Sequence, residues 1–339
     1  MNKRLHRIVF NRCRGLLMAV AETTSSQGKT AGTTPCARTP RAAIALGRST
    51  PLACALWLVG LASWVSVHAQ IVADPTAPGA QRPTVLNAPN GIPLVNIQTP
   101  SAAGVSRNTY KQFDVSSQGA ILNNSRTNTQ TQLGGWVQGN PWLATGSARV
   151  ILNEVNSANP SHLRGPIEVA GQRAEVVIAN PAGIQVNGGG FLNAGRVTLT
   201  TGTPIVSGGS LDGFRVTQGQ IRIEGAGLDA SQTDHATLLT RAVQVNAGIW
   251  ARELTVSTGA QQVSTSLDDA SSAAPLQGSG PAPSVTLDVA QLGGMYAGKI
   301  VLVGTEAGLG VRNAGVIAAT EGPLVVRADG WLDNRGHLQ

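Results

Sequence analysis

The chain has 339 residues, and its 25 Lys or Arg against 18 Asp or Glu give a formal net charge of +7. Nine of the basic residues and one acidic residue lie in the first 69 positions, which leaves 16 basic and 17 acidic residues in the rest of the chain. The part after residue 69 therefore has no excess positive charge with which to attract nucleic acid or anionic lipid. All three cysteines also lie before residue 69, so disulfides cannot stabilise residues 70–339.

Residues 52–67 form an apolar run of 16 residues without charge, which three arginines precede and the small-x-small sequence Val67-His68-Ala69 follows. This order predicts a secretory signal that passes through the Sec translocon and is cut between Ala69 and Gln70. A membrane anchor is the alternative, but the run is shorter than the roughly 20 residues that a spanning helix needs. Cys54 begins the run instead of following it, which argues against a lipid anchor.

Residues 1–35 precede this signal, which by itself needs only about 15 to 30 residues. The block resembles the extended signal-peptide region of very large exported proteins of Gram-negative bacteria, among them two-partner-secretion exoproteins and autotransporters. An upstream start codon that is not used is the alternative. We therefore expect residues 1–69 to be an extended signal peptide.

Beyond the leader, the sequence is typical of short strands joined by tight turns. Charged residues make up 13% of the chain, where soluble domains have about 25%, and Gly and Asn suit turns because they tolerate positive φ angles. The best helix candidate is 234–245. Runs of β-branched residues predict strands at 148–155, 174–179, 196–201, 214–224, 253–257, 284–289, 299–303 and 323–327. The fold class is thus all-β.

A weak internal repeat indicates how these strands are arranged. The pattern Asn-x-Gly-x-apolar begins at Asn193, Asn313 and Asn334, and the last two copies are 21 residues apart. A period of about 20 residues indicates a solenoid, here a parallel β-helix of roughly 13 coils with apolar residues inside and Asn side chains stacked as amide ladders. A sandwich or antiparallel barrel is the alternative, but its strands would recur at about 8–12 residues.

The remaining segments are assigned from composition. Residues 70–124, with their prolines and early strands, are expected to cap the exposed end of the β-helix. Residues 257–283 are poor in large apolar side chains and rich in Ser, Ala, Gly and Pro, which predicts a long loop or linker. This segment separates a core of residues 70–256 from a tail of residues 284–339 that stops in mid-pattern.

Two short segments carry a more specific signal. One contains Asn140, Pro141 and Leu143, and the other contains Asn180, Pro181, Gly183 and Ile184. With ARVILNEV, AEVVIA and NGGGFLNAGRVTL in the same order, they resemble the secretion domain of filamentous-haemagglutinin-type exoproteins, whose signatures are Asn-Pro-Asn-Leu and Asn-Pro-Asn-Gly-Ile. Trp142 and Ala182 replace the second Asn, which removes a side-chain amide able to satisfy backbone groups of a turn.

The resemblance covers most of residues 87–256 and resumes at 292–319. It implies a right-handed parallel β-helix with extra-helical hairpins, a secretion (TPS) domain at 70–256 and the start of passenger repeats at 284–339. It also implies an outer-membrane transporter that binds the domain in the periplasm through POTRA domains, with the seven motif residues named above as candidate recognition residues. Tight corners are the alternative interpretation of both motifs, because Asn-Pro favours turns.

The same resemblance implies a protein that is secreted through the periplasm to the cell surface or the exterior. The full protein would be an adhesin, a haemolysin or a contact-dependent inhibition protein, with a receptor on a host cell or a neighbouring cell. An exported β-helix that binds carbohydrate or acts on polysaccharide is the alternative function. Its candidate acids would be the group Asp212, Glu224, Asp229 and Asp234, which solvated turns also explain.

A search for catalytic chemistry finds no convergent set of residues. His162, His235 and His337 are the histidines after the leader, and none has a second His or Cys at ligand spacing, so we expect surface or turn positions and no metal. The sequence GAGLDA at residues 225–230 fits a loose dinucleotide pattern but lacks the βαβ context, so no cofactor is predicted. We expect no enzyme.

Overall fold

The computed structural model describes residues 6–11, 16–21, 70–265 and 273–339, and the chain divides into two units, Met1–Ser66 and Val67–Gln339. In the first unit, β1 (His6–Asn11) and β2 (Leu16–Ala21) pair as an antiparallel hairpin. The apolar run of the predicted signal and Ala69 lie outside the described residues. Among the residues that are described, no helix is long and apolar enough to span a membrane.

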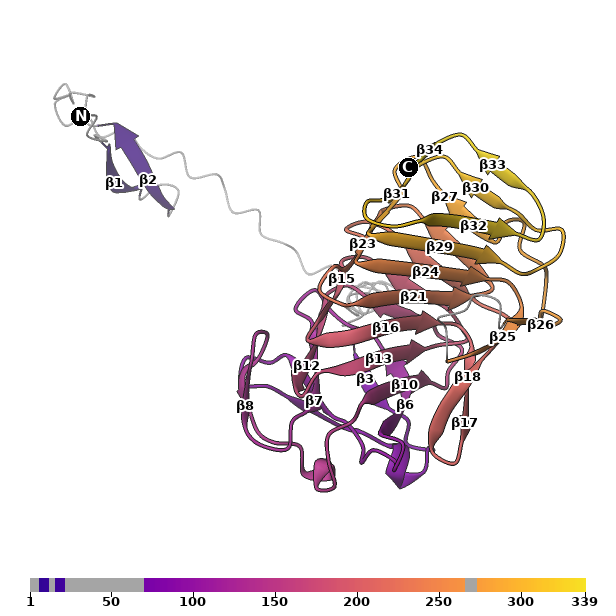
Figure 1. Ribbon diagram of the computed structural model, residues 1–339. Helices are drawn as coiled ribbons and strands as arrows, with labels where there is room; N and C mark the ends of the chain where they lie inside the picture. The colour runs from indigo at the N-terminus through magenta and orange to yellow at the C-terminus, as the bar shows by residue number, and fades with distance from the viewer. Residues whose placement is uncertain (1–5, 12–15, 22–69, 266–272) are drawn as a thin grey trace, which may run out of the picture. The chain divides into compact units, whose positions relative to one another are not determined.

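The second unit is a parallel β-helix built from three long sheets (Figure 1). From β10 on, each coil passes through one strand of the nine-stranded sheet, one of the seven-stranded sheet and one of the ten-stranded sheet. The nine-stranded sheet consists of β3 (Ile71–Ala73), β6 (Val105–Phe113), β10 (Val150–Val155), β13 (Ala174–Ala179), β16 (Ala194–Thr200), β21 (His235–Thr240), β24 (Glu253–Thr258), β29 (Lys299–Gly304) and β32 (Leu324–Ala328). The seven-stranded sheet consists of β11 (Ser161–Leu163), β14 (Ile184–Val186), β19 (Gln220–Ile223), β22 (Ala242–Val245), β27 (Leu287–Val289), β30 (Val311–Asn313) and β33 (Leu332–Asn334). The ten-stranded sheet consists of β4 (Thr84–Asn87), β5 (Pro93–Asn96), β7 (Ala120–Asn124), β12 (Pro166–Gly171), β15 (Gly189–Leu192), β20 (Leu228–Ala230), β23 (Gly248–Ala251), β28 (Gly294–Ala297), β31 (Val316–Ala319) and β34 (His337–Leu338).

Apolar side chains stack inside the helix in columns that run from coil to coil. Residues at equal register in neighbouring parallel strands face the same side of the sheet, so an apolar position in one coil lies over an apolar position in the next. One column of the nine-stranded sheet lies in or against the main core: Ile151, Val176, Val197, Ala236, Leu254, Ile300 and Leu324. The predicted fold class, a right-handed parallel β-helix, is confirmed, and burial between neighbouring coils stabilises it.

The number of coils is smaller than predicted. Val176 pairs with Val197, 21 residues further on, whereas Leu254 pairs with Ile300, 46 residues further on. In the described residues, the nine-stranded sheet contains eight strands that run parallel, because β3 is antiparallel to β6. The estimate of about 13 coils was wrong because it counted chain that leaves the helix between strands as if it formed further coils.

Two of these excursions form a separate antiparallel sheet of four strands, β17 (Thr203–Ser207), β18 (Ser210–Val216), β25 (Gln261–Ser264) and β26 (Ala274–Pro275). Phe214 and Val263 of this sheet pack with Leu152 and Val177 on the outer side of the nine-stranded sheet. The predicted loop at 257–283 does leave the helix, but it carries β25 and β26 and does not link separate bodies. The predicted boundary at residue 256 falls inside β24, which pairs with β29 beyond the excursion.

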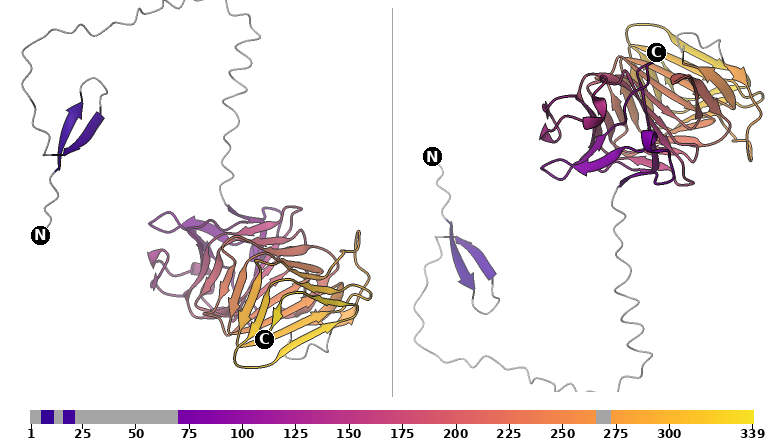
Figure 2. Two further views of the ribbon diagram at one scale, coloured as in Figure 1. Left: turned by 90° about the horizontal axis from the view of Figure 1, so that it is seen from above. Right: turned by 90° about the horizontal axis from the view of Figure 1, so that it is seen from below.

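The predicted cap at 70–124 closes the first coils. β3 pairs with β6, and the hairpin of β4 and β5 ends the ten-stranded sheet. A second hairpin, β8 (Thr129–Thr131) and β9 (Gly135–Val137), stands outside the helix and contributes Val137 to a small apolar cluster with Leu94 and Ile121. Figure 2 shows these purple strands at the end of the stack opposite the yellow C-terminal coils.

The predicted helix at 234–245 is wrong, because this segment forms β21 and β22 in two different sheets. Leu238 points into the main core, while its neighbour Leu239 packs in the cluster beneath the four-stranded sheet. A strand that is buried on both faces reads as a continuous apolar run, which resembles a helix in periodicity. Residues 214–224 likewise form the end of β18 and all of β19, with a turn at Gly219 (φ +86°) between them.

The predicted amide ladder is present at two of the three repeat positions. Asn313 is fully buried and donates from Nδ2 to Oδ1 of Asn334 at 2.8 Å. The third copy, Asn193, lies at a different corner, after β15, with a φ of 55° and hydrogen bonds to the carbonyls of Val169 and Gly171. The shared Asn-x-Gly-x-apolar pattern therefore marks stacked corners only at Asn313 and Asn334.

The ladder gives a first testable expectation. Replacing Asn334 with Ala leaves Nδ2 of Asn313 without this acceptor, so we expect the free energy of unfolding to fall by about 1 kcal/mol. Chemical denaturation of the leaderless protein measures the change. Arg335→Ala is the control, since its ion pair with Asp333 is exposed and is expected to contribute less than about 0.5 kcal/mol. If both substitutions lowered the free energy of unfolding by the same amount, the ladder would not make the expected contribution to stability.

Candidate functional site

Asn140 of the first motif is buried and holds a tight turn. Its Nδ2 donates to the carbonyl oxygens of Ile97 (2.8 Å) and Asn123 (2.9 Å), and its Oδ1 accepts from the backbone N–H of Trp142 at 3.0 Å. Both polar atoms of the side chain are therefore satisfied inside the protein. The amide joins the turn to β7 and to the chain that follows β5.

The rest of the first motif forms the 3-10 turn η2 (Pro141–Leu143), which Asn140 caps. Pro141 suits the first position because its φ is fixed and it has no N–H to satisfy. Leu143 is fully buried and anchors the turn, whereas the Trp142 side chain is 45% exposed. The Trp142 indole donates to Oγ1 of Thr84 at 3.2 Å.

Asn180 of the second motif is fully buried and plays the same part at another corner. Its Nδ2 donates to the carbonyl of Asn159 and to Oγ of Ser161, both at 3.0 Å. Its Oδ1 accepts from the backbone N–H of Ala182 at 2.9 Å. The amide thus ties the corner after β13 to the equivalent corner of the coil before it.

The other residues of the second motif complete this corner. Pro181 is half-buried, Gly183 has a φ of +120°, and Ile184 is buried at the start of β14. A Cβ on Gly183 would lie 3.1 Å from the carbonyl oxygen of Gln220 in the next coil. Glycine is needed here because the φ angle disfavours other residues and the next coil approaches closely.

In both turns the backbone N–H of the third residue bonds to the first Asn, so the turn forms without a second Asn. The two turns lie at different corners, Asn140 between β9 and β10 and Asn180 between β13 and β14. The structure does not bring the motif residues together into one site. Their buried amides hold the local turns, and recognition of these residues by a transporter stays a prediction.

A groove beside the first motif was not predicted from the sequence. It has a volume of about 570 Å³ and lies between β4, β5, the strand β9 and the turn η2. Leu86, Trp136 and Trp142 line it and are 47%, 66% and 45% exposed. The signal that could have revealed it is a pair of tryptophans six positions apart in a chain with only 4% aromatic residues.

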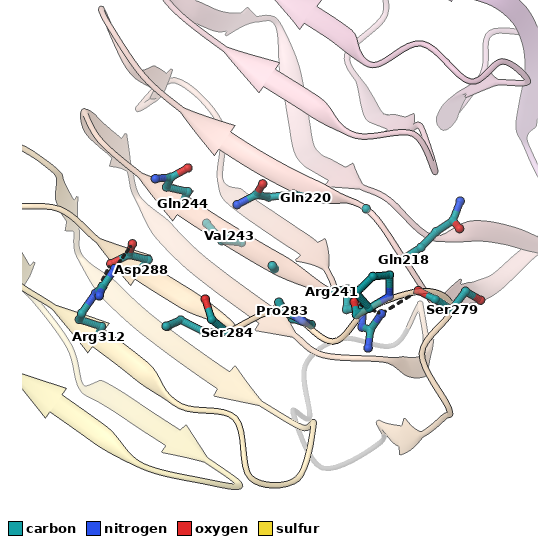
Figure 3. A pocket seen from close by; sticks show the side chains of 14 residues that line it. Gln218, Gln220, Arg241, Val243, Gln244, Ser279, Pro283, Ser284, Asp288 and Arg312 are labelled. Carbon is teal, nitrogen blue, oxygen red and sulfur yellow. Dashed lines mark hydrogen bonds and ion pairs between the residues drawn. The ribbon is translucent and has the colours of Figure 1, made fainter.

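A second, polar groove of about 400 Å³ follows the outer face of the seven-stranded sheet (Figure 3). Arg312 and Asp288 in this groove form a bidentate pair with distances of 2.8 and 2.7 Å. Arg241 bonds to the carbonyls of Ser279 and Pro281 and to a carboxylate outside the groove. Both guanidinium groups of the groove therefore have partners: Arg312 pairs with Asp288, and Arg241 with a carboxylate and two carbonyls.

The three histidines after the leader lie in strands: His337 in β34 is on the surface, as expected, and His162 and His235 are half-buried. His162 in β11 lies 3.3 Å from Asp114, and His235 in β21 lies 3.3 Å from Glu253. Burial, and then the charge of Arg196, lowers the pKa of His235. Within the described ranges, no group of three His, Cys, Asp or Glu side chains could hold a metal ion.

These observations define a class of protein: an exported parallel β-helix with an N-terminal cap. The chain belongs to the TPS secretion domain family, whose model matches residues 69–334. The family model for the Extended Signal Peptide of Type V secretion system matches residues 1–53, which confirms the extended signal predicted for the leader. The protein is thus the N-terminal secretion domain of a two-partner secretion exoprotein, and it is secreted through the periplasm to the cell surface or exterior.

Known relatives agree with this assignment. The chain is 52% identical to "Toxin CdiA" of Yersinia pestis over 339 residues, which are all of this chain and 10% of the relative. It is 48% identical to "tRNA nuclease CdiA-2" of Burkholderia pseudomallei, with 99% of this chain and 11% of the relative covered. The crystal structure of a filamentous hemagglutinin secretion domain matches with a TM-score of 0.65 and 30% identity, over 79% of this chain and 99% of that chain. The chain spans about a tenth of the length of these curated relatives.

Proposed function

We propose that POTRA domains of a cognate outer-membrane transporter bind this domain in the periplasm, and that the domain heads a long contact-dependent inhibition protein. The observation that carries the proposal is the 52% identity to a CdiA toxin over the whole chain, together with the family match over residues 69–334. The names of the relatives support a toxin-type passenger that acts on neighbouring cells. A receptor on such a cell is part of the same proposal.

The architecture suits passage through a transporter. The chain after the leader contains no cysteine, so no disulfide can form in the periplasm and block a narrow pore. Each coil packs on the coils directly next to it, as the column from Ile151 to Leu324 shows. Coils that emerge can therefore fold one at a time on those already outside, and apolar burial there favours outward movement.

The test is secretion of the full chain from Gram-negative cells with and without the cognate transporter gene. We expect the chain in the medium or on the surface only when the transporter is present, and leaderless chain in the periplasm when it is absent. Cells whose transporter lacks its POTRA domains are expected to give the same result as cells without the transporter gene. Equal release without the transporter would contradict the proposal, because it would show export by another route.

A further inference from the structure

We propose that the outer face of the ten-stranded sheet carries a binding site for a neutral oligosaccharide, built on the exposed rings of Trp250 and Tyr296. The site goes beyond the proposed function and does not replace it, because its residues lie outside both motifs and its ligand is not the transporter. The argument starts from the two rings and then adds the polar groups beside them.

Trp250 in β23 and Tyr296 in β28 form an aromatic pair on two neighbouring coils. They are register partners, so their side chains leave the sheet side by side on its outer face. Their ring centroids are 6.3 Å apart, and the ring planes lie within 16° of parallel. The alternate residues Ile249 and Met295 point inward and are fully buried, which gives the rings a rigid base. The rings themselves stay exposed, with 43% of Trp250 and 38% of Tyr296 open to solvent.

Glycines in the same strands set the position of both rings. A Cβ on Gly248 would lie 2.4 Å from Cη2 of Trp250, and a Cβ on Gly294 would lie 2.7 Å from Cε2 of Tyr296. On the coil before, a Cβ on Gly227 would lie 3.0 Å from Cζ3 of Trp250. Each ring therefore occupies the space that a side chain two positions earlier would fill. The rings are placed before a ligand arrives, which lowers the ordering cost of binding.

A polar groove begins at the aromatic pair and follows the corner at which the ten-stranded sheet turns into the nine-stranded sheet. Its first part, of about 520 Å³, is lined by both rings and by Arg252 and Glu321. Its second part, of about 460 Å³, is lined by the same two charged residues and by Asp234, Glu253 and Lys299. The shared residues make the two parts one corner groove, and each volume suits a small ligand, for which pockets measure roughly 300–1,000 Å³.

Several polar groups of the corner groove are available to a ligand. In the described part of the chain, the indole N–H of Trp250, the hydroxyl of Tyr296 and the carboxylate of Glu321 have no hydrogen-bond partner. The Arg252 side chain is 66% exposed; its Nε donates to the Ser231 carbonyl at 3.3 Å, which leaves N–H groups of the guanidinium free. Donors and acceptors thus lie beside the two aromatic rings.

A neutral sugar chain fits this combination of groups better than other ligands do. A hexose ring has an apolar face of C–H groups, which packs on an aromatic ring, and a rim of hydroxyls that both donate and accept. An apolar peptide side chain would bury the free N–H and hydroxyl of the pair without partners, at roughly 1–3 kcal/mol for each group. A nucleic acid also stacks on aromatic rings, but it needs a positively charged groove. Here the charged lining is three acidic residues, Asp234, Glu253 and Glu321, against two basic ones, Arg252 and Lys299.

The test is calorimetric titration of the leaderless protein, whose residues form a structural unit separate from the leader, with maltohexaose, cellohexaose and chitohexaose. We expect at least one of these neutral hexasaccharides to bind. Trp250→Ala and Tyr296→Ala are expected to weaken that binding at least about tenfold, because each removes one of the two rings. Trp331→Ala is the matched control, since Trp331 is also 43% exposed but lies outside the corner groove, and it is expected to leave binding unchanged.

Glu321→Ala provides a second variant that does not touch the packing of the rings. Glu321 lies on an exposed corner, so we expect this variant to unfold at the same denaturant concentration as the wild type and to bind the sugar more weakly. If the wild type bound none of the three sugars, or if Trp250→Ala and Glu321→Ala both bound as the wild type does, the site would be wrong. Binding of a single-stranded oligothymidylate that Trp250→Ala abolishes would also overturn it, because the groove would then serve another class of ligand. The titration contains no transporter, so each of these failures leaves the proposed function standing.

Discussion

Asn180→Ala is expected to lower the stability of the domain by about 2–3 kcal/mol and to reduce secretion strongly. The substitution leaves the N–H of Ala182, the carbonyl of Asn159 and the hydroxyl of Ser161 without their shared partner, and the Ser161 hydroxyl is buried. The loss weakens the corner from which β14 starts. We therefore expect the coil that contains β14 to fold less readily. Denaturant unfolding of the leaderless protein and quantification of secreted chain measure the two effects.

Asn159→Ala is the matched control, because Asn159 also precedes a proline and lies in the same contact. Its side chain is exposed, and the atom that accepts from Asn180 is its backbone carbonyl, which Ala retains. We expect stability within about 0.5 kcal/mol of the wild type and unchanged secretion. If both variants were secreted equally, Asn180 would have no special part in export.

The sequence predicted the turns of both motifs, but it did not reveal that the first Asn of each motif is buried. The Asn-Pro pairs indicated tight corners, and the structure shows corners at Asn140 and Asn180. Their designation as recognition residues stays a prediction, and their complete burial favours a local structural contribution. Burial depends on chain that approaches from other coils, such as the carbonyls of Ile97 and Asn159, and no local pattern reveals it.

The strands were predictable because each one is a short run of β-branched residues, which is a local pattern of the sequence. The run AEVVIA coincides with β13, and the predicted strands at 253–257 and 299–303 overlap β24 and β29. The coil number and the helix at 234–245 were wrong because both depend on chain far away in sequence. The four-stranded sheet buries the outward side of β21 through Leu239, and only the folded protein shows that this cover exists.

The aromatic groove was missed for a related reason. Two tryptophans at positions 136 and 142 lie on different elements, β9 and η2, and line the same groove together with Thr84 and Leu86 of β4. The sequence presents them as one residue of a strand and one altered motif position. Their shared exposure is a property of the cap and not of either segment.

Arg241→Met is expected to destabilise the domain by about 3 kcal/mol, because it leaves a largely buried carboxylate without its partner. Arg241 and Glu306 are 7% and 17% exposed and meet at 2.7 Å, with a second bond at 3.1 Å. Glu306 also accepts from the N–H of Ala260 at 3.2 Å, so the pair fastens the excursion after β24 to the stack. Arg312→Met is the control, since Arg312 is 49% exposed in its pair with Asp288 and solvent screening makes such a pair contribute little to stability.

The contribution of this pair should depend on pH in one direction. The hydrogen bond from Arg241 holds the pKa of Glu306 below its ordinary value of 4.5. Because the folded value lies below the unfolded one, the ionised carboxylate stabilises the protein fully above the unfolded pKa, and this contribution is lost as the pH falls through the folded pKa. The difference in unfolding free energy between wild type and Arg241→Met should therefore be largest near pH 7 and shrink below pH 4.5. A difference that stays constant from pH 7 to pH 3, measured by denaturant unfolding, would mean that the lost packing of the Arg241 side chain, and not its charge, accounts for the effect.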